Sequence, residues 1–195
     1  MLQDYFNERA VDWDRAAAEK DTTKLAALAD RIGLQPGHTV LDAGTGTGIF
    51  LPYILQKIGA SGFVYALDIA EKMLEKAAQK NPQKNIRFIC GSAEKISLPA
   101  NSCDAVVCYS SFPHFQDKPL ALKEMERVLK NGGVLFIGHT SSRQQINHIH
   151  QHSEVTQHDL LPDAVEMTEL LVKAGFTGVR VEDKAESYLA TGKKS

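Results

Sequence analysis

Short apolar runs alternate with amphipathic segments through the middle of the chain, and this alternation limits the possible folds more than any other feature. Five runs are brief and rich in β-branched or aromatic residues, which is typical of strands buried on both faces. They are Thr39–Ala43, Gly62–Leu67, Ile86–Cys90, Ala105–Cys108 and Val134–Ile137. Alternation of strand and helix favours a doubly wound α/β sheet with parallel strands and right-handed crossovers.

The segments between these runs carry apolar side chains at spacings of three and four residues, which predicts amphipathic helices. These helices are expected over Ile49–Ile58, Ala70–Lys80 and Leu120–Leu129. Pro119 suits the first turn of the last one. The pair Gly132-Gly133 is expected to end that helix before the next strand.

Both ends of the chain lie outside the alternation. Apolar positions from Leu25 to Ile32 predict one or two helices before the first strand, closed by Gly33. A helix is expected over Pro162–Ala174, followed by the β-rich runs Phe176–Glu182 and Tyr188–Thr191. The turn between these runs is short enough for a hairpin, so we expect the last strand to be antiparallel to its neighbour.

Composition limits the class of protein and of partner. The 195 residues suit one domain, and 43% hydrophobic with 24% charged residues is close to the average of globular proteins. Lys and Arg number 22 against 24 Asp and Glu, a formal charge of -2, too balanced for the positive field that nucleic-acid binding requires. No apolar run is long enough for a membrane span, and the charged N-terminal stretch does not resemble a signal peptide. We therefore expect a cytoplasmic protein.

The cysteines, Cys90, Cys103 and Cys108, are odd in number and form no CxxC pair. This pattern indicates neither a disulfide framework nor a zinc site. We interpret all three as buried thiols in a reducing compartment.

A glycine-rich loop follows the first predicted strand, with the spacing Gly44-x-Gly46-x-Gly48. Glycines are needed where the backbone turns tightly and approaches a ligand. A dinucleotide fingerprint would have its third glycine at position 49, where Ile49 stands, and the Gly-Lys-Ser/Thr of a triphosphate loop is absent. Asp42, just before the loop, would repel a pyrophosphate but suits a positively charged group such as an amino acid's ammonium.

A second acidic residue, Asp68, ends the second predicted strand, 20 residues after Gly48. A doubly wound fold presents a carboxylate to ribose hydroxyls at this distance. The alternative is that Asp68 only caps the helix that begins near Ala70. Together with the glycine loop and Asp42, it favours a ligand-binding site.

In these residues the sequence resembles the class I S-adenosylmethionine-dependent methyltransferases, in particular the small-molecule type that includes the quinone-biosynthesis enzymes. The resemblance extends from about Gln35 to the end and implies a Rossmann-like, mostly parallel seven-stranded sheet with an antiparallel C-terminal strand and helices on both faces. It also implies S-adenosylmethionine as cofactor, with the loop around its methionine part and Asp68 on its ribose. The residues expected at the cofactor are Asp42, Gly44, Thr45, Gly46, Gly48, Asp68, Ile69, Met73, Ala93, Glu94 and Tyr109.

One position departs from the family pattern. After the third strand the family usually has Gly-Asp-Ala, whose acid reaches the adenine amino group, whereas this chain has Gly91-Ser92-Ala93-Glu94. The Ser92 hydroxyl, the Ala93 backbone or the Glu94 carboxylate could replace that acid.

Methyl transfer requires an aligned acceptor and, where the acceptor carries a proton, a base that removes it. In an open α/β sheet the pocket lies beyond the carboxyl ends of the strands, so the residues after the fourth and fifth strands are candidates. His114 is the first choice for a base, because imidazole titrates near neutral pH. A loop histidine that only contacts a backbone carbonyl is an equal alternative. His139 and His150 complete the predicted catalytic set.

Histidines are concentrated in one segment, His148, His150, His152 and His158, the last followed by Asp159. On a helix His148 and His152 would share a face and His150 would point elsewhere. A solvated polar helix, contacts with the acceptor and a metal site are three possible interpretations. We assign no metal ligand.

The N-terminal run Tyr5–Trp13 carries aromatic residues on one side, which suits either a helix that covers the ligands or one packed on the sheet edge.

The single domain, 1–195, is divided into an N-terminal helical cap (1–34), a cofactor-binding core (35–138), a segment for the acceptor pocket (139–161) and a C-terminal helix with a hairpin (162–195).

The sequence thus predicts a methyltransferase that transfers the methyl group to a small-molecule acceptor by direct displacement, as a monomer or homodimer. The alternatives are a non-catalytic cofactor-binding or metal-sensing protein that uses the histidine segment, and an NAD-dependent oxidoreductase. Asn-Pro-Pro-Tyr, a motif of nucleic-acid methyltransferases, is absent after the fourth strand, where Tyr109–His114 stands.

Overall fold

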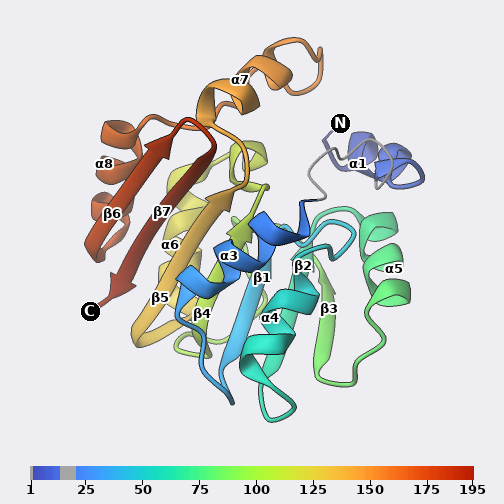
Figure 1. The fold of residues 1–195 in the computed structure, drawn as a ribbon, viewed down its shortest axis with the longest axis vertical. Coiled ribbons are helices and arrows are strands. Elements are labelled where there is room, and N and C mark those ends of the chain that lie inside the picture. Colours follow the sequence, from blue (N-terminus) through green and yellow to red (C-terminus); the bar gives the residue numbers. More distant parts are fainter. Residues whose placement is uncertain (1, 14–20) are drawn as a thin grey trace.

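A computed structural model of the chain describes residues 2–13 and 21–195 (Figure 1). Its centre is a seven-stranded sheet in the order β3-β2-β1-β4-β5-β7-β6. The strands are β1 (Thr39–Ala43), β2 (Phe63–Asp68), β3 (Ile86–Cys90), β4 (Cys103–Tyr109), β5 (Leu129–His139), β6 (Phe176–Lys184) and β7 (Ser187–Lys194). Strands β1 to β5 pair in parallel, and β7 is antiparallel to both β5 and β6. The predicted fold class and the antiparallel last strand are confirmed.

Helices cover both faces of the sheet. They are α1 (Leu2–Arg9), α3 (Thr22–Ile32), α4 (Leu51–Ile58), α5 (Glu71–Lys80), α6 (Lys118–Val128), α7 (Arg143–Gln151) and α8 (Ala164–Ala174), with a 3₁₀ turn, η1, at Phe112–His114. Apolar residues of α3 and α4 form one core cluster with the strands, and those of α6 and α8 form a second. In Figure 1, α1 and α7 lie beyond the end of the sheet toward which β4 and β5 point.

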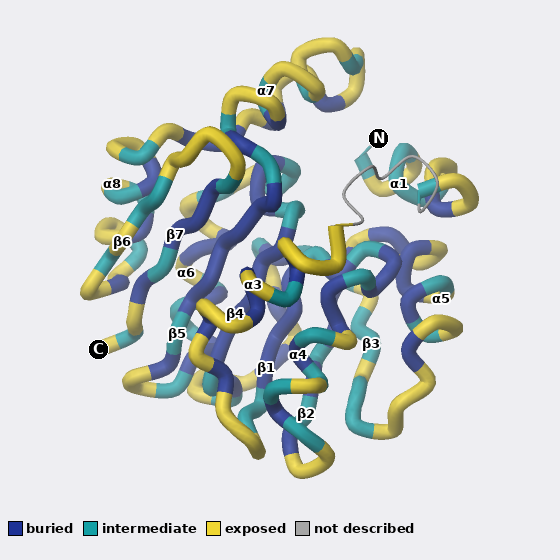
Figure 2. Tube along the Cα trace, viewed as in Figure 1, coloured by how far each residue is buried: buried dark blue, intermediate teal, exposed yellow. Residues whose placement is uncertain are grey.

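The central strands are the most deeply buried part of the molecule (Figure 2). In β4, for example, Cys103 and Val106 have no exposed surface. This agrees with their apolar composition, because parallel strands under helices are covered on both faces.

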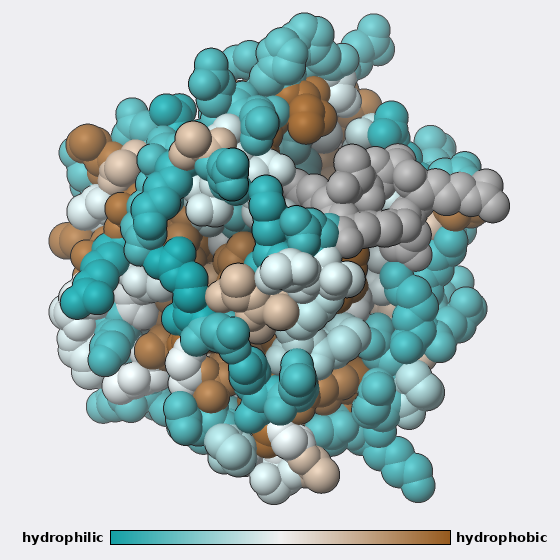
Figure 3. Space-filling view, in the orientation of Figure 1, coloured by the Kyte–Doolittle hydropathy of each residue, from teal (hydrophilic) through white to brown (hydrophobic). Residues whose placement is uncertain are grey.

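The outer face seen in Figure 3 is largely hydrophilic, with apolar side chains in separate groups. No helix among the described residues is both long and apolar enough to cross a membrane.

Local sequence signals explain where several helices begin and end. The Asp21 carboxylate accepts hydrogen bonds from the first amides of α3, and Gly33 ends that helix with a φ of 77°, a left-handed conformation that favours glycine. Asp163 and Gly175 serve α8 in the same way. Pro119 lies in the first turn of α6, as predicted.

Two predictions about the fold are wrong. Helix α6 ends at Val128 rather than at Gly132-Gly133, because Leu129 already pairs with Cys103 as part of β5. The pairing register then shifts before Ala105 meets Val134, so the glycines lie in an irregularity within β5. Among the cysteines, Cys90 is exposed, because it ends the edge strand β3 with its side chain facing outward.

Candidate active site

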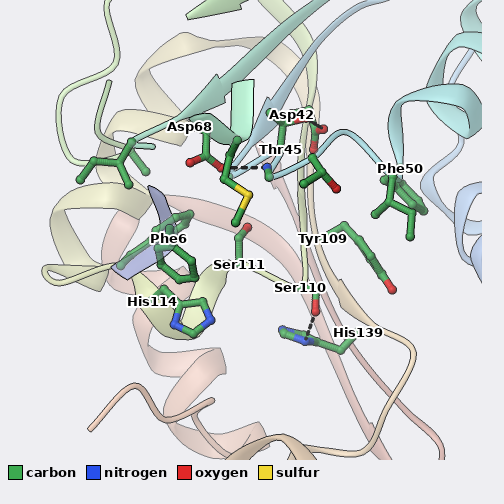
Figure 4. A pocket seen from close by; sticks show the side chains of 18 of the residues that line it. Phe6, Asp42, Thr45, Phe50, Asp68, Tyr109, Ser110, Ser111, His114 and His139 are labelled. Carbon is green, nitrogen blue, oxygen red and sulfur yellow. Dashed lines mark hydrogen bonds between the residues drawn. The ribbon is translucent and has the colours of Figure 1, made fainter. Parts of the chain in front are cut away.

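A cavity of about 520 Å³ opens at the carboxyl ends of the central strands. It lies beside β1 and β4, where the connections lead to opposite sides and doubly wound sheets bind ligands. Figure 4 shows Asp42 and Asp68 near one end of this cavity and His114 and His139 toward the other. Of the predicted site residues, the cavity is lined by Asp42, Gly44, Thr45, Gly46, Asp68, Ile69, Met73, Ala93, Glu94, Tyr109, His114, His139 and His150.

The glycine loop turns from β1 back over the end of β2. The backbone amides of Gly44 and Thr45 donate to the carbonyl of Leu67 at 2.8 and 2.9 Å. Gly44 has a φ of 75°, and a Cβ at this position would lie 2.4 Å from the Cβ of Ser111. A side chain at Gly44 would therefore be both strained and blocked, which explains the first glycine of the motif.

Gly48 is the predicted cofactor residue that does not line the cavity. Its φ is also 75°, but a Cβ there would meet Asn81 Nδ2 at 2.7 Å and Ala77 Cβ at 3.0 Å. Both neighbours belong to or follow α5, and Asn81 donates a hydrogen bond to the Gly48 carbonyl. The missing side chain of Gly48 thus allows the loop to pack closely against α5.

The Asp68 carboxylate contacts both the glycine loop and the residue that precedes α5. Its Oδ1 accepts a hydrogen bond from the Ala70 amide at 2.9 Å, beside the start of α5, and its Oδ2 accepts one from the Gly46 amide at 2.8 Å. Burial raises the pKa of Asp68, whereas these two amides act in the opposite direction. The carboxylate is therefore fixed against the glycine loop at the wall of the cavity.

Asp42 is almost completely buried under the loop. The Thr45 hydroxyl donates to its Oδ2 at 2.6 Å. Burial raises the pKa of Asp42 to about 7, and the nearby charge of Asp68 acts in the same direction, against the effect of the Thr45 hydroxyl. A cationic ligand group at this position would favour the ionised carboxylate.

The segment after β3 joins this end of the cavity to the loop after β4. The Ser92 hydroxyl donates to Glu94 Oε2, and Glu94 Oε1 accepts the backbone amide of Gln116 at 2.9 Å. The Glu94 carboxylate thus holds the segment that carries His114. Ile69 and Met73 provide apolar cavity surface at the same end.

His114 and His150 meet at Asp159. His114 Nδ1 lies 2.8 Å from Asp159 Oδ2, and His150 Nδ1 lies 2.5 Å from the Asp159 backbone carbonyl. The centres of the two imidazole rings are 4.7 Å apart. Asp159 does not serve the adjacent His158, which is exposed.

His139 ends β5 and is buried in the cavity wall. Its Nδ1 lies 3.5 Å from the hydroxyl of Ser110, whose positive φ of 57° is rare for a residue other than glycine (Figure 4). His139 Nε2 is buried without a hydrogen-bond partner among the described residues. Burial lowers the pKa of His139 to about 3, so this imidazole is neutral at physiological pH.

The remaining histidines of the segment face away from this group. His148 and His152 share a face of α7 with ring centres 4.4 Å apart, and both are exposed, whereas His150 lines the cavity. The segment is helical through Gln151, and the three histidines have the relative directions that a helix gives them. In the described part of the chain, no group of three or more His, Cys, Asp or Glu side chains has an arrangement that could hold a metal ion.

The N-terminal aromatic run contributes to the cavity. Phe6 packs edge-on against His114, with ring centres 5.1 Å apart, and against Trp13 at 5.6 Å. It also packs on the cluster of Ala70 and Met73. Phe6 and Trp13 line the cavity, so this segment packs on the body of the protein and borders the cavity at the same time.

An aromatic wall opposite α1 was not predicted from the sequence. Phe50 stacks on Tyr109 with ring centres 4.8 Å apart, and the Tyr109 hydroxyl lies 3.1 Å from Thr140 Oγ1. Phe50 lies within the helix predicted over Ile49–Ile58 and in the structure immediately precedes α4. No local sequence signal shows that Phe50 contacts Tyr109, which ends β4.

Comparisons with known proteins agree with this architecture. Residues 41–137 match the family described as methyltransferase domain. The ubiquinone/menaquinone biosynthesis C-methyltransferase UbiE of Pasteurella multocida is 36% identical over 112 residues, 55% of this chain and 42% of that protein. The uncharacterized methyltransferase YdaC of Bacillus subtilis is 30% identical over 121 residues, 62% and 66% of the two chains. The chain thus spans about half the length of the curated relatives that it matches.

A solved structure extends the agreement over nearly the whole chain. The S-adenosylmethionine-dependent methyltransferase of Aquifex aeolicus is 26% identical, with a TM-score of 0.76, covering 97% of this chain and 98% of that one. The glycine loop and the acidic strand end both line the cavity at the carboxyl edge of the doubly wound sheet, where such sheets bind ligands. The chain belongs to the class I S-adenosylmethionine-dependent methyltransferases. The cofactor of this class is S-adenosylmethionine.

Proposed function

We propose that this protein transfers a methyl group from S-adenosylmethionine to a proton-bearing small molecule, with His114 as the base that accepts the proton. The observation that carries the proposal is the pairing of His114 with Asp159 in the same cavity that holds the glycine loop and Asp68. In this proposal the cofactor binds at one end of the cavity, and the imidazole at the other end contacts a carboxylate.

The cofactor end suits the ligand chemically. A cavity of about 520 Å³ is within the usual range for cofactor sites. The Asp68 carboxylate has lone pairs for ribose hydroxyls, and Ile69 offers apolar surface for a purine. Asp42 would pair with the ammonium of the methionine part. S-adenosylmethionine supplies, when bound, a methyl group on a positively charged sulfur.

The residues at the acceptor end accept the acceptor's proton and form hydrogen bonds with the acceptor. The acceptor atom forms a bond to the methyl carbon as the carbon–sulfur bond breaks, and the electron pair of that bond remains on sulfur. The acceptor's proton passes to Nε2 of His114, and the Asp159 carboxylate stabilises the resulting imidazolium. His139 stays neutral and offers its free Nε2 as a hydrogen-bonding group.

The direct test is transfer of a labelled methyl group from S-adenosylmethionine to a panel of phenols, amines and thiols. We expect at least one acceptor to be labelled, with stoichiometric release of S-adenosylhomocysteine, and His114→Gln to reduce kcat at least about 100-fold. The exposed variant His148→Gln is the matched control and keeps the wild-type rate. Cofactor binding without transfer to any member of the panel, or full activity of His114→Gln, would contradict the proposal.

A further inference from the structure

Asp159 fixes two imidazoles rather than one. Its carboxylate contacts His114 Nδ1 at 2.8 Å, and its backbone carbonyl contacts His150 Nδ1 at 2.5 Å. The two histidines come from η1 and α7, which are far apart in sequence. Both rings line the cavity with their centres 4.7 Å apart.

These contacts determine which nitrogen of each ring faces the ligand. A carbonyl oxygen only accepts hydrogen bonds, so His150 Nδ1 must carry the proton and its Nε2 must carry a lone pair. The Asp159 carboxylate selects the same tautomer in neutral His114. No described residue forms a hydrogen bond with Nε2 of either ring. The cavity is therefore lined by two adjacent imidazole nitrogens that both accept hydrogen bonds.

The two rings cannot act as equal bases. Burial lowers the pKa of His150, and a positive charge on His114 lowers it further. Once His114 holds a proton, His150 remains a neutral hydrogen-bond acceptor. The pair is thus suited to one hydroxyl that loses its proton and a second that keeps it.

The surroundings favour an uncharged, flat acceptor. Phe6 lies edge-on to His114, and Phe115, Ile146 and Ile149 add apolar surface to the cavity. Among the described residues that line it, Lys24 is the one with a permanent positive charge, and none is an arginine. A phosphate or carboxylate on the acceptor would lack the bidentate partner that such groups usually have.

We propose that His114 and His150 together recognise a vicinal dihydroxyaromatic acceptor of the catechol type, with His150 as the residue that determines specificity. The inference rests on the methyltransferase function proposed above. Neighbouring imidazoles can reach oxygens on adjacent ring carbons, whereas para hydroxyls point to opposite sides of a ring. Phenolic hydroxyls are also acidic enough for an imidazole base, unlike those of an alkyl diol.

In this reaction one catechol oxygen forms the new bond to the methyl carbon. The carbon–sulfur bond breaks with its electron pair left on sulfur, and the proton of that hydroxyl passes to His114 Nε2. The second hydroxyl keeps its proton and donates a hydrogen bond to His150 Nε2 throughout. The product is a monomethyl ether with one free hydroxyl.

The test measures binding of catechol, hydroquinone and phenol to the protein saturated with S-adenosylhomocysteine, by calorimetry under anaerobic, reducing conditions. We expect catechol to bind at least about tenfold more tightly than either of the others, because only catechol can satisfy both nitrogens. His150→Phe should reduce this preference to less than about threefold. His148→Phe, on the exposed face of α7, should keep it.

Equal binding of catechol and phenol by the wild type, tighter binding of hydroquinone, or an unchanged preference in His150→Phe would overturn the inference. The order of the three affinities in the wild type tests the preference for catechol even if His150→Phe does not fold. A protein that binds S-adenosylhomocysteine without preferring catechol refutes only the acceptor class. A protein that does not bind S-adenosylhomocysteine refutes the proposed function itself, and this inference with it.

Discussion

The contact between Asp159 and His114 gives the sharpest quantitative prediction, through the substitution Asp159→Asn. The carboxylate is mostly buried and lies 2.8 Å from His114 Nδ1. A charge-assisted hydrogen bond of this kind contributes about 1.5–3 kcal/mol. That interaction is strongest when His114 holds the transferred proton, so its loss acts on the transition state, and kcat should fall about 10- to 100-fold.

The assay is methyl transfer under saturating cofactor, with kcat and KM measured separately for the best acceptor of the panel. Asparagine keeps the backbone carbonyl that binds His150, so the second imidazole stays in place. We expect kcat to change more than KM. A double-mutant cycle with His114→Gln isolates the pairwise effect, because Asp159→Asn should cost little further activity once the imidazole is absent.

Two results would refute this reasoning. One is a kcat of Asp159→Asn within about twofold of wild type. The other is an equal loss of activity in the presence and absence of His114, which would mean that Asp159 supports only the local fold. The free energy of unfolding of each variant, measured by urea denaturation, distinguishes a loss of folded protein from a loss of catalysis.

Other perturbations test the remaining parts of the site. Gly44→Ala should lower the free energy of unfolding by about 2–5 kcal/mol, and Gly46→Ala, where a Cβ meets open space, by only about 1–2 kcal/mol; equal losses in urea denaturation would contradict this. Because burial raises the pKa of Asp42 to about 7, the affinity for S-adenosylhomocysteine should rise about tenfold from pH 6 to pH 8 in calorimetry, and Asp42→Asn should abolish that rise. The pKa of His139 is lowered to about 3, so the folded state loses stability as pH falls below about 6.5. The free energy of unfolding of His139→Leu, measured by urea denaturation, should therefore rise by about 2 kcal/mol relative to that of the wild type between pH 7 and pH 5. A difference that stays constant with pH would refute the burial of a neutral imidazole. S-adenosylhomocysteine should change the fluorescence of Trp13, the only tryptophan, and no change would argue against its place in the cavity.

The sheet, and the positions of the glycine loop and Asp68 at its edge, could be predicted from the sequence because their signals are local. Buried parallel strands appear as short apolar runs, and a glycine loop between strand and helix has a fixed spacing. Asp68 follows from its distance to that loop. The motif spacing did not show, however, that Gly48 packs against α5 and does not line the cavity.

The acceptor end could be predicted only as a set of candidates. A helix would direct His150 away from His148 and His152, but nothing in the sequence links His150 to His114. Their common partner, Asp159, is adjacent to His158 in sequence and contacts a histidine 45 positions away. Such contacts depend on how the loops after β4 and β5 pack together, and hydrophobic patterning does not encode that arrangement.

We propose that the loop after β1 and the carboxylate of Asp68 bind the adenosyl cofactor. Calorimetric titration of S-adenosylhomocysteine and NAD into the wild type, Asp68→Asn and Asp117→Asn tests it most directly. Asp117 caps α6 outside the cavity and serves as the control. We predict that S-adenosylhomocysteine binds the wild type and Asp117→Asn alike, binds Asp68→Asn at least about tenfold more weakly, and is preferred to NAD. Binding of NAD but not S-adenosylhomocysteine, or undiminished binding to Asp68→Asn, would contradict the account.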